Sequence, residues 1–144
     1  MIHFNRFCFI LTAGSLHMLA GCDSGPLMQP VAGTVSYHGE RLKFGNVMFQ
    51  HASGGQPSTA AIQPDGSFVL TTHGAGEGVR VGPHRVRITC FEGNNPDRPN
   101  TLGSGEKVMG KSLIPSRYNS FGGSGLKVIV EAGEDQRFDF ELTD

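Results

Sequence analysis

The sequence predicts an all-β fold, a seven-stranded β-sandwich with Greek-key connections. Three observations support this fold class. Seven short segments alternate apolar with polar residues, as strands with one buried face do. Turn-forming residues separate these segments, and no segment has a convincing helical period. The composition agrees, because the 144 residues include 21 glycines and no tryptophan, and only 17% of them are charged.

The expected strands follow the order of the alternating segments. Residues 31–37 form the first strand, with valine, glycine and tyrosine on its inward face, and a Gly-Glu pair at 39–40 marks the turn that follows. Residues 47–50 form the second strand, and residues 61–62 belong to a shorter third. The strongest turn is Pro64-Asp65-Gly66-Ser67, where glycine can adopt positive φ after an aspartate that caps its own backbone.

Three more strands and a long connection follow this turn before the last strand. The fourth strand covers residues 68–70, the fifth 86–90 and the sixth 126–130, each with apolar residues at every second position. The seventh covers residues 137–142, with two phenylalanines and a leucine inward and three charged residues outward. The connection at 92–112 is long and rich in glycine, asparagine and proline, so it is the first place to look for a binding surface.

The amino-terminal segment has the layout of an export signal. A short polar start with Arg6 precedes an apolar run from Phe7 to Leu19, which is shorter than the roughly 20 residues that a spanning helix needs. The run ends in Leu19-Ala20-Gly21-Cys22, which resembles the lipobox of bacterial lipoproteins. The resemblance implies that the Cys22 thiol receives a diacylglycerol, that the bond before it is cut, and that acyl chains such as palmitate anchor the protein.

These residues define the expected domains and location. Residues 1–21 form the signal peptide with its lipobox, residues 22–29 a short linker, and residues 30–144 one β-sandwich domain. We expect export and lipid anchoring to a membrane of the cell envelope. Inner and outer membrane both stay open, although Asp23 resembles a residue that holds some lipoproteins at the inner membrane. The alternative is an ordinary signal peptide with a chance cysteine, or a buried amino-terminal helix.

Cysteine use and charge exclude several classes of protein. Cys8 would leave with the signal peptide and Cys22 would carry lipid, so Cys90 stays alone and no intramolecular disulfide can form. Cys90 continues the inward face of residues 86–90, so we expect a buried, unreactive thiol. Loss of Arg6 takes the net charge from -1 to about -2, which argues against nucleic acid as a partner.

Six segments behind the lipobox share a recognisable order and spacing: residues 31–39, 45–49, 65–68, 114–118, 124–126 and 138–142. They resemble small bacterial lipoproteins with a transthyretin-like domain, also called a carboxypeptidase regulatory-like domain. The resemblance implies a prealbumin-like sandwich without assigned catalytic residues. Arg41 in place of a proline and His84 in place of a tyrosine depart from the family pattern. Related enzymes that act on hydroxyisourate end in Tyr-Arg-Gly-Ser, whereas this chain ends Glu141-Leu142-Thr143-Asp144, so that activity is not expected.

Side chains that could carry chemistry form no recognisable motif. His38, His51, His73 and His84 are scattered and none has metal-ligand spacing, so we expect exposed strand or turn histidines. No serine lies in the Gly-x-Ser-x-Gly motif of a nucleophile elbow. We therefore expect no enzyme, no catalytic residue, no metal and no cofactor. Residues 114–118 are expected to form a structural latch, because Tyr118 can bury its ring while its hydroxyl finds a partner.

Arg80, His84, Arg85 and Arg87 form a local positive cluster. It predicts a patch for acidic glycans or anionic headgroups, with Arg85 and Arg87 on one strand face, and a solvated sheet face balanced by nearby glutamates is the alternative. The predicted function is a membrane-anchored lipoprotein whose non-enzymatic sandwich binds or supports an envelope protein or glycan. The alternative function is a small-ligand-binding or hydrolase-type transthyretin relative, with a pocket near His84 and the 92–112 loop.

Overall fold

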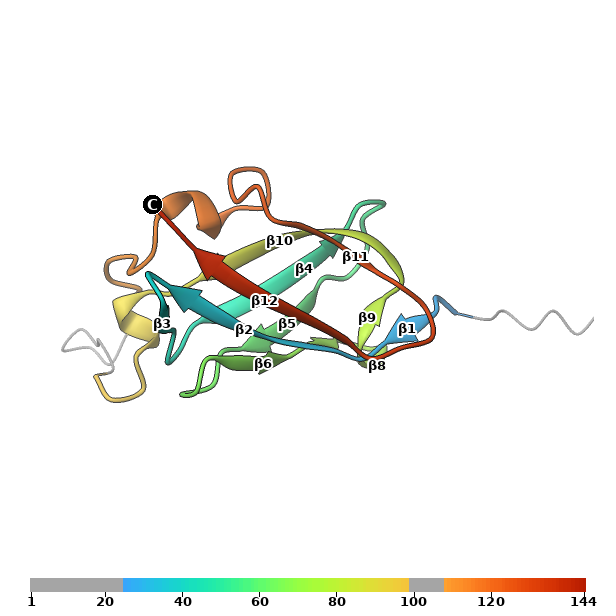
Figure 1. Cartoon of the computed structure of the whole chain (residues 1–144), viewed down its shortest axis with the longest axis horizontal. Coiled ribbons are helices and arrows are strands. Elements are labelled where there is room, and N and C mark those ends of the chain that lie inside the picture. Colours follow the sequence, from blue (N-terminus) through green and yellow to red (C-terminus); the bar gives the residue numbers. More distant parts are fainter. Residues whose placement is uncertain (1–24, 99–107) are drawn as a thin grey trace, which may run out of the picture.

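The computed structural model describes residues 25–98 and 108–144 of the chain. These residues form two β-sheets that pack face to face, with a short two-stranded ribbon at one end (Figure 1). The all-β sandwich that the sequence predicts is therefore confirmed. The predicted signal peptide, the predicted lipobox and Cys22 lie outside the described residues, and so does the middle of the 92–112 loop.

The described chain contains short strands and two 3-10 helices, η1 (Glu92–Asn94) and η2 (Ser116–Asn119). The strands are β1 (Met28–Gln29), β2 (Val31–Tyr37), β3 (Glu40–Arg41), β4 (Asn46–His51), β5 (Ser58–Ala61), β6 (Ser67–Val69), β7 (Thr71–Thr72), β8 (Gly76–Glu77), β9 (Val79–Arg80), β10 (Gly82–Thr89), β11 (Lys127–Val130) and β12 (Gln136–Leu142). One sheet has the order β11-β10-β4-β5-β7-β8, and the other has β12-β2-β3 with β6 also paired to β2. β1 and β9 form the ribbon.

β2 and β12 form a parallel pair, in which Phe138 lies opposite Gly33. A Cβ atom on residue 33 would lie 1.9 Å from the carbonyl oxygen of Phe138, closer than any side chain can approach. Glycine is therefore required where β2 passes β12. Side chains reinforce the pair, since the Thr34 hydroxyl donates to the Asp139 carboxylate at 2.7 Å.

One hydrophobic core fills the space between the two sheets. Phe49 of β4 is fully buried, and its ring centroid lies 5.9 Å from that of Phe138 and 6.1 Å from that of Phe140 on the opposite sheet. These distances suit tilted and edge-on aromatic pairs. Burial of each large apolar side chain contributes about 2 kcal/mol, and Cys90 is buried as a free thiol. Packing therefore joins the two sheets.

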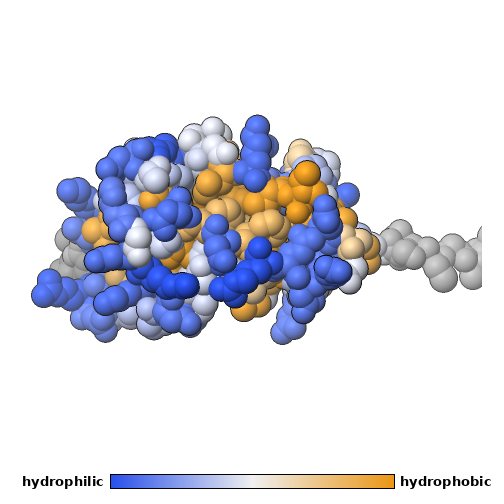
Figure 2. All heavy atoms as spheres, in the orientation of Figure 1, coloured by the Kyte–Doolittle hydropathy of each residue, from blue (hydrophilic) through white to orange (hydrophobic). Residues whose placement is uncertain are grey.

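The sandwich is open along the side where β11 and β12 are edge strands of the two sheets. Figure 2 shows apolar surface gathered over β11 and beside β12, bounded by hydrophilic side chains. Leu126, Val128, Phe138 and Phe140 are partly buried against the core, and Ile129, on the outer face of β11, is 64% exposed. This open side leaves apolar atoms of the core in contact with solvent.

The seven predicted strands are all present, as β2, β4, β5, β6, β10, β11 and β12. Alternation does not predict the five two-residue strands, because so short a segment has no period. One of these, β1, falls within residues 22–29, the range of the predicted linker. The predicted Asp-Gly turn is confirmed, since Gly66 has a φ of 82° and the Ser67 amide donates to Asp65 at 2.9 Å.

Candidate functional site

The basic residues that the sequence groups together lie on different surfaces. His84 is 3% exposed and faces the core, in line with Val86, whereas Arg85 and Arg87 face outward from β10. Arg80 lies on β9, where its guanidinium donates to the Ser53 hydroxyl at 3.3 Å. The alternation of β10 therefore turns the His84 side chain to the opposite face from Arg85 and Arg87, and His84 lines one hollow with Arg80 and another with Arg85.

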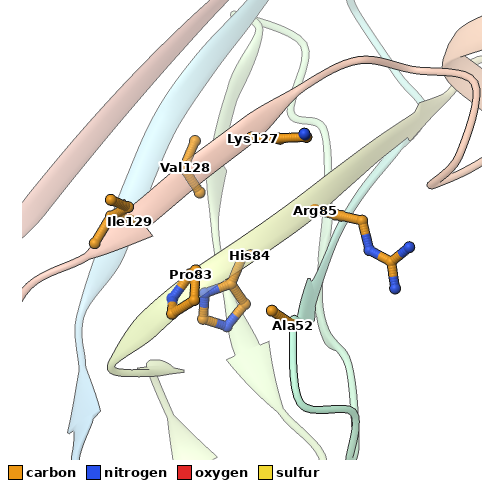
Figure 3. Close-up of a pocket in the computed structure, with 7 residues that line it drawn as sticks. All are labelled: Ala52, Pro83, His84, Arg85, Lys127, Val128 and Ile129. Carbon is orange, nitrogen blue, oxygen red and sulfur yellow. The ribbon is translucent and has the colours of Figure 1, made fainter.

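The first hollow, which we call the outer pocket, has a volume of about 530 Å³. Strand pairing places Pro83 opposite Ile129 and Arg85 opposite Lys127. An apolar pair therefore lies beside a cationic pair on the same sheet face. Figure 3 shows Pro83 and Arg85 extending from β10, and Lys127 and Ile129 from β11. The lining residues are Ala52, Pro83, His84, Arg85, Lys127, Val128 and Ile129.

The sheet face around the outer pocket is cationic. The strands β4, β5, β7, β10 and β11 contain no aspartate or glutamate, and the acid of this sheet is Glu77 on its far edge strand β8. Arg85, Arg87 and Lys127 form no ion pair with a described carboxylate, and the Arg87 guanidinium lies over the Phe121 ring at 5.2 Å from the centroid. Carboxylates occupy the outward positions of β12 instead, at Asp139 and Glu141. The two outer faces of the sandwich therefore differ in charge.

The second hollow, which we call the histidine pocket, has a volume of about 290 Å³ and includes Met28 of β1 and Arg80 of β9 in its lining. His51 on β4 and His84 on β10 are direct cross-strand partners, and their rings meet edge to face with centroids 4.9 Å apart. His73, between β7 and β8, also lines the pocket. Three histidines that are scattered in the sequence therefore come together, and the expected exposure is wrong for buried His84.

Hydrogen bonds fix the neutral tautomers of His51 and His84. Nδ1 of His84 lies 2.9 Å from the Gly82 carbonyl oxygen, so Nδ1 donates and Nε2 is left as an acceptor. The Ser53 amide donates to Nδ1 of His51 at 3.1 Å, so Nε2 carries the proton of that ring. Gly82 permits this arrangement, because a Cβ at this position would lie 2.6 Å from Nε2 of His51.

Burial sets the protonation of the two most enclosed titratable groups. It lowers the pKa of His84, and nearby His51 and Arg80 act in the same direction against the Gly82 carbonyl. Burial also raises the pKa of Cys90 to about 11, so this thiol is protonated and unreactive near neutral pH, in agreement with the sequence. Within residues 25–98 and 108–144, no group of three or more His, Cys, Asp or Glu side chains is placed to hold a metal ion.

The described residues do not join His84 and the 92–112 loop in one pocket. His84 precedes Phe91 by seven residues, or about 23 Å of extended chain. The outer pocket and the histidine pocket include no described residue of the loop. Asn94 and Met109 of the loop line a separate hollow of about 370 Å³ together with Arg87. The pocket of the alternative function is thus divided between the two ends of β10.

Comparison with known proteins assigns no family. No family model matches the chain, and no curated protein matches it either. Two solved structures are similar in part: a variant of BcpA, the major pilin subunit of Bacillus cereus, with a TM-score of 0.43 and 10% identity, and a DUF3823 family protein from Parabacteroides merdae, with a TM-score of 0.37 and 15% identity. The matches cover 82% and 80% of this chain but only 30% and 44% of those chains.

Neither of the helices in the described part of the chain is long and apolar enough to cross a membrane.

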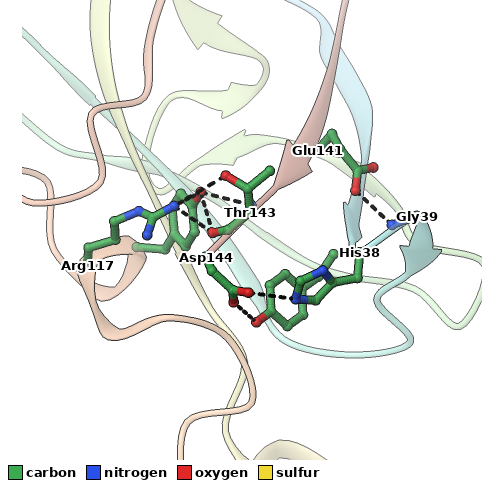
Figure 4. Close-up of polar contacts among 8 residues, drawn as sticks. His38, Gly39, Arg117, Glu141, Thr143 and Asp144 are labelled. Atoms are coloured by element: carbon green, nitrogen blue, oxygen red, sulfur yellow. Dashed lines mark hydrogen bonds and ion pairs between the residues drawn. The ribbon is translucent and has the colours of Figure 1, made fainter.

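The predicted latch at residues 114–118 contacts the carboxy-terminal end of β12 (Figure 4). Tyr118 is 5% exposed, and its hydroxyl donates to the Thr143 carbonyl and accepts from the Thr143 amide, both at 3.1 Å. Arg117 donates to the same hydroxyl at 2.8 Å and lies over the ring. Tyr37 donates to the Asp144 carboxylate at 2.6 Å beside it. These bonds hold the last residues of the chain against the sandwich.

Tyr118→Ala is expected to lower the free energy of unfolding by roughly 3–5 kcal/mol, because it removes a buried ring. Tyr118→Phe keeps the ring and is expected to cost about 1 kcal/mol for the lost hydroxyl bonds. Chemical denaturation of the full chain measures both. Tyr37→Phe is the matched control, because its hydroxyl bonds to the exposed Asp144 carboxylate. A Tyr118→Ala protein that unfolds at the wild-type denaturant concentration would contradict the latch.

Lowering the pH from 7 to 5 is expected to destabilise the protein through His84. Its pKa is below the ordinary 6.5 in the folded state, so the unfolded chain binds a proton that the native state rejects. Stability therefore falls as the pH drops below about 6.5 and levels off below the native pKa. Thermal unfolding of the full chain, followed against pH, measures this loss.

The His84→Gln variant is expected to lose stability less steeply than wild type between pH 7 and 5. His73→Gln is the control, since His73 is exposed. The lowered pKa values of Asp139 and Glu141, which hydrogen bonds from Thr34 and Ser36 cause, act in a separate window near pH 4 and below. Equal slopes for wild type and His84→Gln would refute the assignment of this transition to His84.

Proposed function

We propose that the protein is a lipid-tethered β-sandwich of the cell envelope that binds an acidic glycan through the outer pocket and catalyses no reaction. The observation that carries this proposal is the juxtaposition of two pairs on one sheet face, on strands that contain no aspartate or glutamate. Arg85 and Lys127 supply cations, and Pro83 and Ile129 supply apolar surface beside them. A glycan with carboxylate groups offers both complements, because the C–H face of a sugar ring is apolar.

The shape of the outer pocket suits such a ligand. Its volume of about 530 Å³ lies in the range of small-ligand sites. The pocket lies on an outer sheet face and is open to solvent. An internal segment of a glycan polymer can therefore bind in it without an end of the polymer having to enter first. Arg85 and Lys127 are free to bind, since neither pairs with a described carboxylate. The guanidinium of Arg85 can donate two parallel hydrogen bonds to one carboxylate.

The sequence at Leu19 to Cys22 supports the tether, and the position of β1 supports a domain held close to the membrane. β1 begins at Met28, six residues after Cys22, and is fixed by its pairing with β9. Six residues span at most about 20 Å. A lipid on Cys22 would therefore keep the end of the sandwich that carries β1 within about 20 Å of the membrane surface, and a carbohydrate partner would lie in that layer.

Cys22→Ser is expected to abolish labelling of the protein by radioactive or clickable palmitate in the producing bacterium and to move it from the membrane fraction to the soluble fraction. Two or more acyl chains are needed for stable anchoring, and this variant has no acceptor for them. Cys8→Ser is the matched control and is expected to keep both the label and the membrane fraction. Persistent labelling of the Cys22→Ser protein would refute the tether.

An Arg85→Ala, Lys127→Ala double variant is expected to lose most of its retardation in affinity electrophoresis through gels that contain polygalacturonate. Wild type is expected to be retarded at low salt and released as salt rises, because screening weakens exposed charge pairs. The control is Arg41→Ala, Arg137→Ala, which removes the same net charge from the other sheet. Equal retardation of both double variants, or no retardation of wild type, would contradict the glycan site.

A further inference from the structure

The histidine pocket has the donors of an anion site and plays no part in the glycan proposal. Its lining contains one arginine and three histidines and, among the described residues, no aspartate or glutamate. Arg80 is exposed, and its guanidinium is a planar group with five N–H donors. Its guanidinium uses one nitrogen on the Ser53 hydroxyl, which leaves further N–H groups for a ligand.

His51 and His84 both line the pocket, and their hydrogen bonds give the two Nε2 atoms opposite roles. Nε2 of His51 carries a proton, because its Nδ1 accepts from the Ser53 amide. Nε2 of His84 lacks one, because its Nδ1 donates to the Gly82 carbonyl. Burial lowers the pKa of His84, so the acceptor persists at neutral pH. The pocket therefore combines several donors with one fixed acceptor.

Backbone geometry adds donors at the rim. Gly55 and Gly74 both line the pocket at positive φ, 99° and 77°. No acceptor for either amide is found among the described residues. Turns of this kind present N–H groups toward anions. Ser58 contributes no donor, because Thr72 donates to the Gly78 carbonyl and so must accept from the Ser58 hydroxyl.

We propose that the histidine pocket binds a phosphate group that retains one proton, either free inorganic phosphate or a phosphate monoester at the end of a larger molecule. Arg80, His51 and the glycine amides donate to the unprotonated oxygens, and Nε2 of His84 accepts the remaining P–O–H proton. The volume of about 290 Å³ admits a phosphate with a small substituent. Sulfate is rejected, because it carries no proton at neutral pH and would place a lone pair against Nε2 of His84.

The test is an NMR titration of the full chain in detergent micelles with inorganic phosphate at pH 7, followed through the imidazole C–H resonances. The resonances of His51 and His84 are expected to shift and saturate. Sodium sulfate at the same ionic strength is expected to bind at least about tenfold more weakly, because it leaves the buried acceptor Nε2 of His84 unsatisfied. Absence of a saturable shift with phosphate, or equal affinity for sulfate, would overturn the proposal.

Arg80→Gln is expected to weaken phosphate binding by about tenfold or more, because it removes a charge-assisted hydrogen bond. Arg137→Gln is the matched control, since this arginine lies on the outer face of β12. The Arg85→Ala, Lys127→Ala double variant is expected to bind phosphate like wild type, so the phosphate site and the glycan site can fail separately. Unchanged phosphate affinity in Arg80→Gln would overturn the assignment of the site.

A second experiment distinguishes free inorganic phosphate from a phosphate monoester on a lipid headgroup. The Cys22→Ser chain is mixed with phosphatidylcholine vesicles that either contain or lack phosphatidate, a lipid with a terminal phosphate monoester. Sedimentation with phosphatidate vesicles alone, lost in an added Arg80→Gln change, assigns the site to a lipid headgroup. Saturable binding of inorganic phosphate without such sedimentation assigns it to the free ion. Sedimentation that survives Arg80→Gln would contradict headgroup binding in the pocket.

Discussion

The pairing of β10 on both its edges is the interaction on which the rest of the structure depends. β10 lies between β4 and β11 in antiparallel register, so its residues are fixed on either side. Val86 and Ile88 then face the core, while Arg85 and Arg87 face outward. The same pairings place His84 against His51 and Arg85 against Lys127. Both proposed sites therefore follow from the register of one strand.

The seven longer strands can be predicted from the sequence because each buries one face, and alternation records that burial directly. Alternation does not show which strands pair with one another. The parallel contact between β2 and β12 joins residues more than 100 positions apart, and only Gly33 inside an otherwise apolar strand face indicates a close backbone approach. Strands of two residues, such as β1 and β9, have no period and depend on the pairing alone.

The sites were less predictable for the same reason. Arg85 and Arg87 could be placed on one face by counting, and the same count places His84 on the inward face, two residues before Val86. Grouping the basic residues by their closeness in the sequence hides this difference in side-chain orientation. Lys127 lies in the outer pocket and His51 in the histidine pocket because of the register in which β11 and β4 pair with β10. The local sequence does not encode that register. The buried imidazole of His84 fills an aromatic position in the core, since its ring centroid lies 6.0 Å from that of Phe49.

The two proposed sites lie on a sheet face and at one end of the sandwich. A direct measurement of the β10 register tests this arrangement: nuclear Overhauser effects between the ring protons of His51 and His84 in the full chain. We predict cross-peaks, because the ring centroids lie 4.9 Å apart. Cross-peaks from the His84 ring to Met48 or Lys127, whose side chains belong to the outer face, together with none to His51, would contradict the account.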